Sequence, residues 1–360
     1  MRPICATIRL SALRHNLALA RARAPRSRVW AVVKANAYGH GLVRAVGAFD
    51  AADGFALVEV DAAARLRDQG CTKPLLMIEG FFSPEELAEY SARGLAAVIH
   101  NIEQVRMLEQ SRLAAAPVAV YLKLNTGMNR LGFCGSRAVY ALDRLRACAS
   151  VSSIALMTHF ADADGKGGVA EQLERFGAMG LDPSLPRSLA NSAALLRYPE
   201  THADWVRPGI MLYGCSPFSD KSAQALGLKP AMTLTSRIIA VQDLQSGEPV
   251  GYGAAFTARA PMRIGIVACG YAHGYPRHAP GFSDRGTPII VGGMRTVILG
   301  RVSMDMLAAD ITRIPQAGVG TEVTLWGEGL SADEVAAAAD TLSYELLCAL
   351  APHVRVIETD

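Results

Sequence analysis

The sequence predicts an α/β chain in which a TIM-like (β/α)8 barrel is followed by a C-terminal all-β domain. Between residues 29 and 214, eight short apolar segments alternate with helical patterns. After about residue 225 the segments become short and rich in Val, Ile and Thr, with Gly, Pro and Asp between them. A doubly wound open sheet is the alternative, but no Gly-x-Gly-x-x-Gly turn follows the first segment, so the barrel is favoured.

The barrel prediction depends on eight expected strands and on helix signals between them. We expect the strands at residues 29–33, 55–60, 75–78, 96–99, 118–124, 154–157, 188–190 and 206–213, of which the seventh has the weakest pattern. Ser83 precedes Pro84 and two glutamates, which is typical of a helix start. Ser136 likewise opens an amphipathic stretch over 137–148.

The same patterns divide the chain into three parts. Residues 1–10 carry a short segment, 5–10, that we expect to join the C-terminal β domain as a strand. Residues 11–225 form the barrel, beginning with a helix for which Ser11 is the expected N-cap. Residues 226–360 form the β domain, with strands expected at 233–242, 263–268, 287–291, 296–302 and 322–326 and a helix from 332 to about 340.

Composition limits the class of protein. A net charge of +3 without a Lys/Arg run gives no support to nucleic-acid or membrane-surface binding. No apolar stretch approaches the ~18 residues of a membrane span, and the N-terminus lacks the apolar core of a signal peptide. The seven cysteines are scattered and form no Cys-x-x-Cys pair, which is typical of reduced thiols. We therefore expect a soluble cytoplasmic enzyme with a small-molecule substrate and no bound metal.

Lys34 is the most informative single residue. It ends the first apolar segment, in the string Ala-Val-Val-Lys-Ala-Asn-Ala-Tyr-Gly-His-Gly over residues 31–41. Burial at a strand end disfavours the ammonium form and makes the amine a usable nucleophile, although a lone lysine at such a position is more often a solvated cap. Tyr38, four residues on, carries a hydroxyl suited to holding a phosphate.

Other polar residues follow later strands of the predicted barrel. Lys123 and Arg130 come with the fifth strand, His159 with the sixth, Ser192 with the seventh and Arg207 with the eighth. Each has an ordinary structural explanation, such as an ion pair, a core histidine or a surface arginine. Because the carboxyl ends of barrel strands meet at one rim, their convergence predicts an active site there.

Seven ordered segments of the chain resemble the signature segments of the bacterial alanine racemases, a family that depends on pyridoxal 5'-phosphate (PLP). The similarity extends from about residue 3 to residue 355. The segments are 31–41, 125–133, 205–214, 250–256, 270–275, 300–306 and 343–345. The resemblance implies a PLP-dependent isomerase that interconverts L-alanine and D-alanine. It also implies a head-to-tail homodimer, in which each active site lies where one barrel meets the partner's β domain.

The resemblance assigns two catalytic bases. Lys34 would hold PLP covalently and take the Cα proton of D-alanine, and Tyr252, supplied by the partner subunit, would act on the opposite face. Because a phenol is a weak base at neutral pH, nearby cations must stabilise its phenolate, and His159 and Arg207 match that role. Arg207 would also meet the pyridine nitrogen. As an always-charged donor it would leave that nitrogen unprotonated and so limit transamination.

The remaining roles are assigned in the same way. Arg130 would bind the PLP phenolate oxygen and the substrate carboxylate, with the backbone amide of Met304 beside it, and Tyr271 of the partner chain would line the entrance. Lys123 matches a position that the family often carbamylates to orient the arginine. The residues that match the phosphate-binding positions are Tyr38, Ser192, Gly209, Ile210 and Tyr344.

Three positions depart from the family pattern, and three other functions remain open. Asn125 and His273 each stand where aspartate is expected, and Ser303 stands where some members have cysteine. We expect His273 to alter the access channel near Tyr271. The alternatives are a racemase of broader range, a barrel-type PLP decarboxylase, for which a Gly-Gly-Gly phosphate loop is missing, and a non-catalytic PLP-binding protein, which would resemble the barrel alone. Both supply of D-alanine as a peptidoglycan precursor and its degradation remain open.

Overall fold

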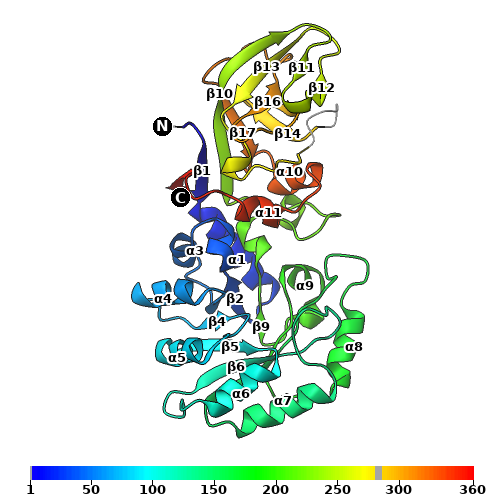
Figure 1. Cartoon of the computed structure of the whole chain (residues 1–360). Helices are drawn as coiled ribbons and strands as arrows, with labels where there is room; N and C mark the ends of the chain where they lie inside the picture. Colours follow the sequence, from blue (N-terminus) through cyan, green and yellow to red (C-terminus); the bar gives the residue numbers. More distant parts are fainter. Residues whose placement is uncertain (1, 280–285) are drawn as a thin grey trace.

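The computed structural model describes residues 2–279 and 286–360, which form a closed eight-stranded parallel barrel and an eight-stranded sheet that lies beyond one end of it (Figure 1). The predicted combination of a barrel with a mostly-β C-terminal domain is therefore confirmed. No helix in the described part of the chain is long and apolar enough to cross a membrane.

The barrel strands are short and almost wholly buried, as parallel strands covered by helices must be. They are β2 (Arg28–Val32), β3 (Gly54–Leu57), β4 (Leu75–Met77), β5 (Leu95–Ile99), β6 (Val118–Lys123), β7 (Val151–Met157), β8 (Arg187–Ser188) and β9 (Trp205–Val206). The last strand closes the barrel by pairing with the first, Val206 lying opposite Val29. Every strand end that carries a candidate site residue therefore faces the same rim.

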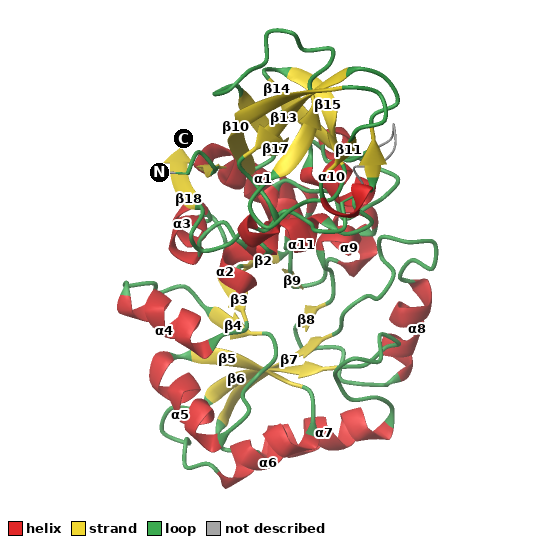
Figure 2. Cartoon of the chain, turned by 45° about the horizontal axis from the view of Figure 1, so that its top comes forward, coloured by secondary structure: helices red, strands yellow, loops and turns green. Residues whose placement is uncertain are grey.

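Helices cover the outside of the barrel (Figure 2). They are α1 (Leu10–Arg23), α3 (Leu42–Ala48), α4 (Val60–Asp68), α5 (Pro84–Arg93), α6 (Ile102–Gln110), α7 (Ser136–Ala147), α8 (Ala170–Ala178) and α9 (Ser192–Arg197). The predicted cap of α5 is present, because the Ser83 hydroxyl accepts a hydrogen bond from the Glu86 amide at 3.2 Å. Apolar residues on the inner face of each helix then pack against the strands.

Three local predictions were wrong. The segment 55–60 ends as a strand at Leu57, and Val60 already begins α4. The segment 206–213 is a two-residue strand followed by the 3-10 helix η2 (Ile210–Tyr213). Pro208 has no amide hydrogen for a strand ladder, so the ladder cannot continue through it. Helix α1 starts at Leu10 with Arg9 at its N-cap, so Ser11 is not the cap.

The second sheet combines both ends of the chain with the region after the barrel. Its order is β13 (Met262–Val267), β16 (Leu307–Asp310), β15 (Met294–Leu299), β14 (Pro288–Val291), β17 (Glu322–Trp326), β10 (Met232–Leu244), β1 (Cys5–Arg9) and β18 (Arg355–Thr359). Ala6 of β1 lies opposite Leu234 of β10 and Val356 of β18. The N-terminal strand therefore anchors the barrel's first helix to this sheet.

Several elements of the C-terminal region were not predicted. A small hairpin, β11 (Pro249–Val250) with β12 (Phe256–Thr257), precedes β13, and strands β16 and β18 also lacked a clear sequence pattern. Two short 3-10 helices, η4 (Tyr252–Ala254) and η5 (Tyr271–His273), occupy loops of the same region. Helix α10 (Ala332–Ala338) was expected, whereas α11 (Ser343–Cys348) was not.

Helix α11 contacts the rim of the barrel (Figure 2). It packs against α2 (Lys34–Tyr38), the turn that follows β2, and Gly39 ends that turn with φ +77°. A Cβ built on Gly39 would lie 2.1 Å from the Leu347 carbonyl oxygen of α11. Only glycine therefore fits at this contact between the first barrel loop and the C-terminal region.

Replacing Gly39 by alanine should destabilise the protein by about 3 kcal/mol, because the left-handed φ and the clash with α11 act together. Gly70→Ala is the matched control, since Gly70 has φ +84° but open space where its Cβ would stand. That control should cost only about 1 kcal/mol. Urea unfolding followed by circular dichroism measures both, and equal losses would contradict a close contact between Gly39 and Leu347.

Candidate active site

A cavity of about 610 Å³ opens at the carboxyl ends of the barrel strands. Its walls come from the residues that follow β2, β4, β6, β7, β8 and β9, and from one face of α11. The lining includes ten of the residues that the sequence predicted for the site: Lys34, Tyr38, Lys123, Arg130, His159, Ser192, Arg207, Gly209, Ile210 and Tyr344. The topology therefore brings together side chains that lie up to about three hundred residues apart in the chain.

Three other predicted residues do not line this cavity within the described part of the chain. Tyr252 lies on η4, Tyr271 on η5, and Met304 in the loop before β16, all in the C-terminal region. Their exposed fractions are 67%, 40% and 55%. These three side chains are therefore accessible at the surface of this chain and contribute nothing to the cavity wall.

The chain after β2 adopts an unusual conformation. Ala35, Asn36, Ala37 and Tyr38 have φ between 51° and 55°, which is one turn of left-handed helix. Such a conformation costs about 1–2 kcal/mol for each residue with a side chain. The turn places both Lys34 and Tyr38 on the wall of the cavity.

A buried histidine holds this left-handed turn. The His40 Nδ1 atom lies 2.8 Å from the Tyr38 carbonyl oxygen and 3.2 Å from that of Ala37, so this nitrogen carries the proton and donates it. Burial lowers the pKa of His40 to about 4, which keeps the ring neutral. The Asn36 side chain adds a bond, since its oxygen accepts from the Leu42 amide at 2.9 Å. The sequence reasoning missed His40, although its place between two glycines was a signal.

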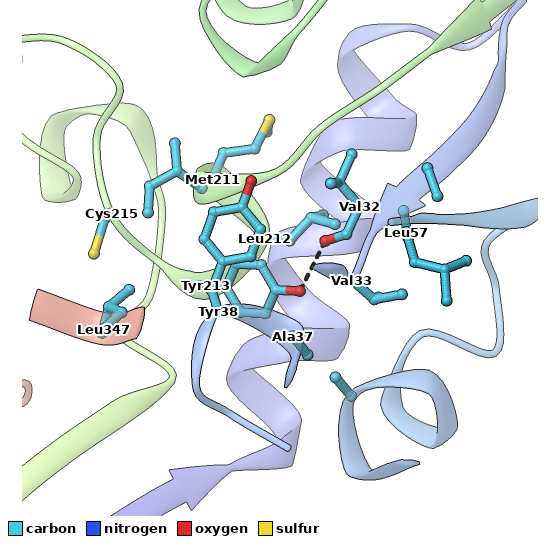
Figure 3. Close-up of a cluster of buried hydrophobic side chains, with 14 of the residues drawn as sticks. Val32, Val33, Ala37, Tyr38, Leu57, Met211, Leu212, Tyr213, Cys215 and Leu347 are labelled. Atoms are coloured by element: carbon cyan, nitrogen blue, oxygen red, sulfur yellow. Dashed lines mark hydrogen bonds between the residues drawn. The ribbon is translucent and has the colours of Figure 1, made fainter. Parts of the chain in front are cut away.

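Aromatic rings pack against the turn. The rings of Tyr38 and Tyr213 stack with their centroids 4.6 Å apart, and His40 lies 4.7 Å from Tyr213. The Tyr213 hydroxyl donates to the Val32 carbonyl at 2.8 Å, which is the dashed line in Figure 3. Burial raises the pKa of both phenols, so they remain protonated hydrogen-bond donors.

Hydroxyl and amide groups meet in one corner of the cavity. The Ser192 hydroxyl accepts a hydrogen bond from the Gly209 amide at 2.8 Å. A Cβ on Gly209 would lie 2.6 Å from the Tyr38 hydroxyl, so glycine keeps this corner open. The ring of Tyr344, on α11, lies 6.0 Å from that of Tyr38. Groups of this kind bind phosphate oxygens.

Arg207 is fixed in the cavity wall by its two terminal nitrogens. Nη1 donates to the carbonyl and the hydroxyl of Ser188 at 2.6 and 2.8 Å, and Nη2 donates to the Thr158 carbonyl at 2.6 Å and the Leu189 carbonyl at 3.1 Å. Burial lowers the pKa of Arg207 to about 10, which leaves the guanidinium charged at neutral pH. It is thus a rigid positive charge beside the cavity.

Burial also changes the charge of Lys123 and His159. Burial first, and then Arg207 and Arg130, lower the pKa of Lys123 to about 8. The same causes lower the pKa of His159 well below its usual value, so its imidazole is neutral. This shift favours Arg207 as the charged member of that predicted pair, and the role of His159 toward the second base stays a prediction.

Glu79 is a cavity residue that the sequence reasoning missed. Among the lining residues of the described chain it is the single carboxylate. It follows β4, so its position just beyond a strand end was the available signal. Its negative charge raises the pKa of Lys123 and opposes the effect of the neighbouring cations.

The departures from the family pattern have local explanations. The Asn125 side-chain oxygen accepts from the amides of Gly127 and Asn129 at 3.1 and 3.0 Å, bonds that an aspartate would also make. His273 is 1% exposed and its Nδ1 accepts from the Gly270 amide at 3.2 Å. Any effect of His273 on the access channel near Tyr271 would therefore be indirect, through the short helix that carries Tyr271. Ser303 contributes its carbonyl, which accepts from the Tyr271 amide at 3.1 Å.

Comparison with known proteins agrees with this architecture. The family models "Alanine racemase, N-terminal domain" and "Alanine racemase, C-terminal domain" match residues 8–217 and 231–358. Alanine racemase of Nitrosospira multiformis is 56% identical over 357 residues, covering 98% of this chain and 99% of that one. The Cupriavidus necator alanine racemase is 54% identical over 354 residues, covering 98% and 95%.

Solved structures give the same result. The crystal structure of the biosynthetic alanine racemase from Pseudomonas aeruginosa matches with a TM-score of 0.94 and 48% identity, covering 100% of both chains. The structure of alanine racemase from Acinetobacter baumannii matches with a TM-score of 0.93 and 38% identity, again covering 100% of both chains. The chain therefore belongs to the alanine racemase family of isomerases.

Proposed function

We propose that this protein interconverts L-alanine and D-alanine by a two-base mechanism, with PLP as cofactor, in a homodimer with shared active sites. One observation carries the proposal: the barrel cavity contains Lys34, whereas the second candidate base, Tyr252, lies on the C-terminal region and is 67% exposed. A two-fold symmetric dimer can bring the two together from different subunits. Membership of the alanine racemase family supports this reaction.

The residues of the cavity fit PLP. The corner formed by Tyr38, Ser192 and Gly209 offers the hydroxyls of Tyr38 and Ser192, the latter held by the Gly209 amide, and a Cβ at Gly209 would obstruct it. We place the phosphate there, with Ile210 and Tyr344 completing the binding residues, and we assign the covalent link to Lys34. The cavity volume of about 610 Å³ suits a ligand of this size. Bound PLP would supply the electron sink that acidifies the Cα proton of an amino acid.

Arg207 is suited to donate a hydrogen bond to the pyridine nitrogen of PLP. Its bonds to Ser188, Thr158 and Leu189 run through Nη1 and Nη2 and hold the guanidinium still. With a pKa of about 10 it remains a donor at neutral pH and gives no proton away. A pyridine nitrogen that accepts from Arg207 would stay unprotonated, which would favour racemisation over transamination.

Two bases act on opposite faces of the substrate Cα. Lys34 Nζ takes the Cα proton of D-alanine, and Tyr252 of the partner subunit delivers a proton from the other face. For L-alanine the roles reverse, so each turnover leaves the two bases with exchanged protonation states. Because a phenol is a weak base, the fixed charge of Arg207 supplies the stabilisation that its anion needs.

The substrate carboxylate is assigned to Arg130. The backbone amide of Met304 and the side chain of Tyr271, both supplied by the partner subunit, would stand beside it and at the entrance. We propose that Lys123 is carbamylated and orients Arg130. Carbamylation requires a neutral amine to attack carbon dioxide and lose a proton, and a pKa of about 8 provides that neutral form near neutral pH.

The direct test of the reaction is proton exchange at Cα. Both enantiomers of alanine should exchange Cα hydrogen with deuterated solvent and should interconvert. Release of carbon dioxide would instead indicate a decarboxylase, exchange across many amino acids a racemase of broad range, and no exchange a PLP-binding protein without catalysis. Growth of a deletion strain with and without D-alanine distinguishes supply of peptidoglycan precursor from degradation.

Lys34→Ala should abolish covalent capture of PLP and racemisation in both directions, because Lys34 is assigned the covalent link. Borohydride reduction of the wild type, followed by peptide mapping, should place the pyridoxyl label on Lys34. Lys123→Gln is the matched control and should still be labelled at Lys34. A wild-type label on Lys123 would overturn the assignment.

Arg207→Glu should allow the pyridine nitrogen to take a proton, because a carboxylate stabilises the protonated ring. Racemisation should fall by about a hundredfold or more, a typical loss for an active-site electrostatic group, while transamination rises relative to it. Keto-acid formation measured beside racemisation gives the ratio, and Arg207→Lys, which keeps the charge, serves as the control. An unchanged ratio in Arg207→Glu would mean that Arg207 does not face the nitrogen.

Lys34→Ala and Tyr252→Ala homodimers should each be inactive or nearly so, yet mixing them should restore activity. In a mixed dimer one site carries both changes while the other regains both bases. Random re-association of equal amounts makes about half the dimers mixed, so recovery should approach roughly a quarter of wild-type activity. Native mass spectrometry verifies subunit exchange. If exchange occurs without recovery, both bases belong to one chain.

A further inference from the structure

His273 holds together the short helix that carries Tyr271. Its Nδ1 accepts a hydrogen bond from the Gly270 amide at 3.2 Å, and its own amide donates to the Gly270 carbonyl at 3.0 Å. The side chain is 1% exposed. Because an amide can only donate, Nδ1 must be unprotonated, and the proton of the neutral ring sits on Nε2.

This helix is joined to the loop that carries Met304. The Tyr271 amide donates to the Ser303 carbonyl at 3.1 Å, and the Ala272 amide donates to the Met304 carbonyl at 2.9 Å. A Cβ on Gly270 would lie 2.2 Å from the Ser303 oxygen and 2.4 Å from the Met304 oxygen. Tyr271 and Met304 therefore belong to one unit, and the bond from Gly270 to His273 closes it.

The surroundings of His273 oppose a positive charge on its ring. Burial first, and then the charges of Arg2 and His353, lower the pKa of His273, while Asp305 acts in the opposite direction. The His353 ring centroid lies 5.3 Å away. Protonation would put a hydrogen on Nδ1, facing the Gly270 amide hydrogen, so the bond would be lost.

We propose that His273 is a positioning residue for substrate binding, whose unprotonated ring fixes Tyr271 and the Met304 backbone where the partner subunit's cavity receives them. This inference rests on the proposed function. As pH falls, the bond to Gly270 breaks, the unit loosens, and substrate binding weakens. Aspartate, the residue that the family pattern leads one to expect here, would accept the same bond without titrating at the same pH.

The sign of the effect on stability follows from the same geometry. In the unfolded chain His273 binds a proton near its ordinary pKa of about 6.5, whereas in the folded chain it binds one only at lower pH. At pH values between the folded-state pKa and the unfolded-state pKa of His273, the unfolded state binds more protons than the folded state. The contribution of His273 to stability is therefore present above the unfolded value and is lost as pH falls through that window.

Two variants separate the bond from the titration. His273→Gln keeps a neutral acceptor that does not titrate, and His273→Leu removes the acceptor. The KM for alanine is measured at pH 5.5 and at pH 8.5, and the first value is divided by the second. This ratio should be at least about twofold larger for the wild-type holoenzyme than for the Gln variant. At pH 8.5 the Leu variant should have a KM about fivefold higher than that of the wild type at the same pH, with kcat less affected.

Thermal unfolding gives a measurement that does not depend on activity. On acidification from pH 8.5 to 5.5, the Gln variant should lose about 2 °C less in Tm than the wild type. His278→Gln is the matched control, since His278 is exposed and lies five residues away, and it should keep the wild-type pH dependence. Equal KM ratios for wild type and His273→Gln, or a Leu variant with wild-type KM at pH 8.5, would overturn the inference. Absence of Cα proton exchange in the wild type would instead overturn the proposed function.

Discussion

The left-handed turn after β2 is the constraint on which the rest of the site depends. Four consecutive residues with side chains adopt a conformation that costs about 1–2 kcal/mol each, so the turn persists only because its surroundings hold it. The buried His40 ring, which follows the turn, and Tyr213 of η2, whose ring stacks on that of Tyr38, do so. Gly39 fits against α11 from the other side. This one turn fixes Lys34 and connects the barrel to the C-terminal region.

The electrostatics of the cavity follow from burial of cations. Arg207 stays charged because the pKa of a guanidinium is so high that burial lowers it only to about 10. Burial lowers the pKa of Lys123 to about 8, which brings this lysine close to neutrality, and it keeps His159 neutral. One buried rim therefore contains a permanent cation, a lysine that is easily deprotonated and an uncharged histidine. With Glu79 as the single carboxylate among the described lining residues, the cavity favours anionic groups such as a phosphate or a carboxylate.

The two halves of the proposed site differ in how they are held. The barrel half is built on strand ends inside a continuous core, so its side chains have few alternative positions. The other half lies on short 3-10 helices, η4 and η5, whose order depends on individual bonds such as that from Gly270 to His273. On our proposal, one proton on His273 is enough to loosen the second half, because it removes such a bond.

The sequence by itself determined the barrel and the β region, because apolar periodicity reports burial, and it predicted that polar residues meet at one rim, because strand ends converge there. Together with the family resemblance, it also identified in advance ten of the residues that line the cavity, Lys34 among them. It did not determine the left-handed turn, the roles of His40 and Glu79, the place of His273, or the burial that lowers the pKa of His159. Those depend on which groups surround a residue in three dimensions. Burial, hydrogen-bond partners and neighbouring charges arise from segments far apart in the chain, and only the tertiary structure brings them together.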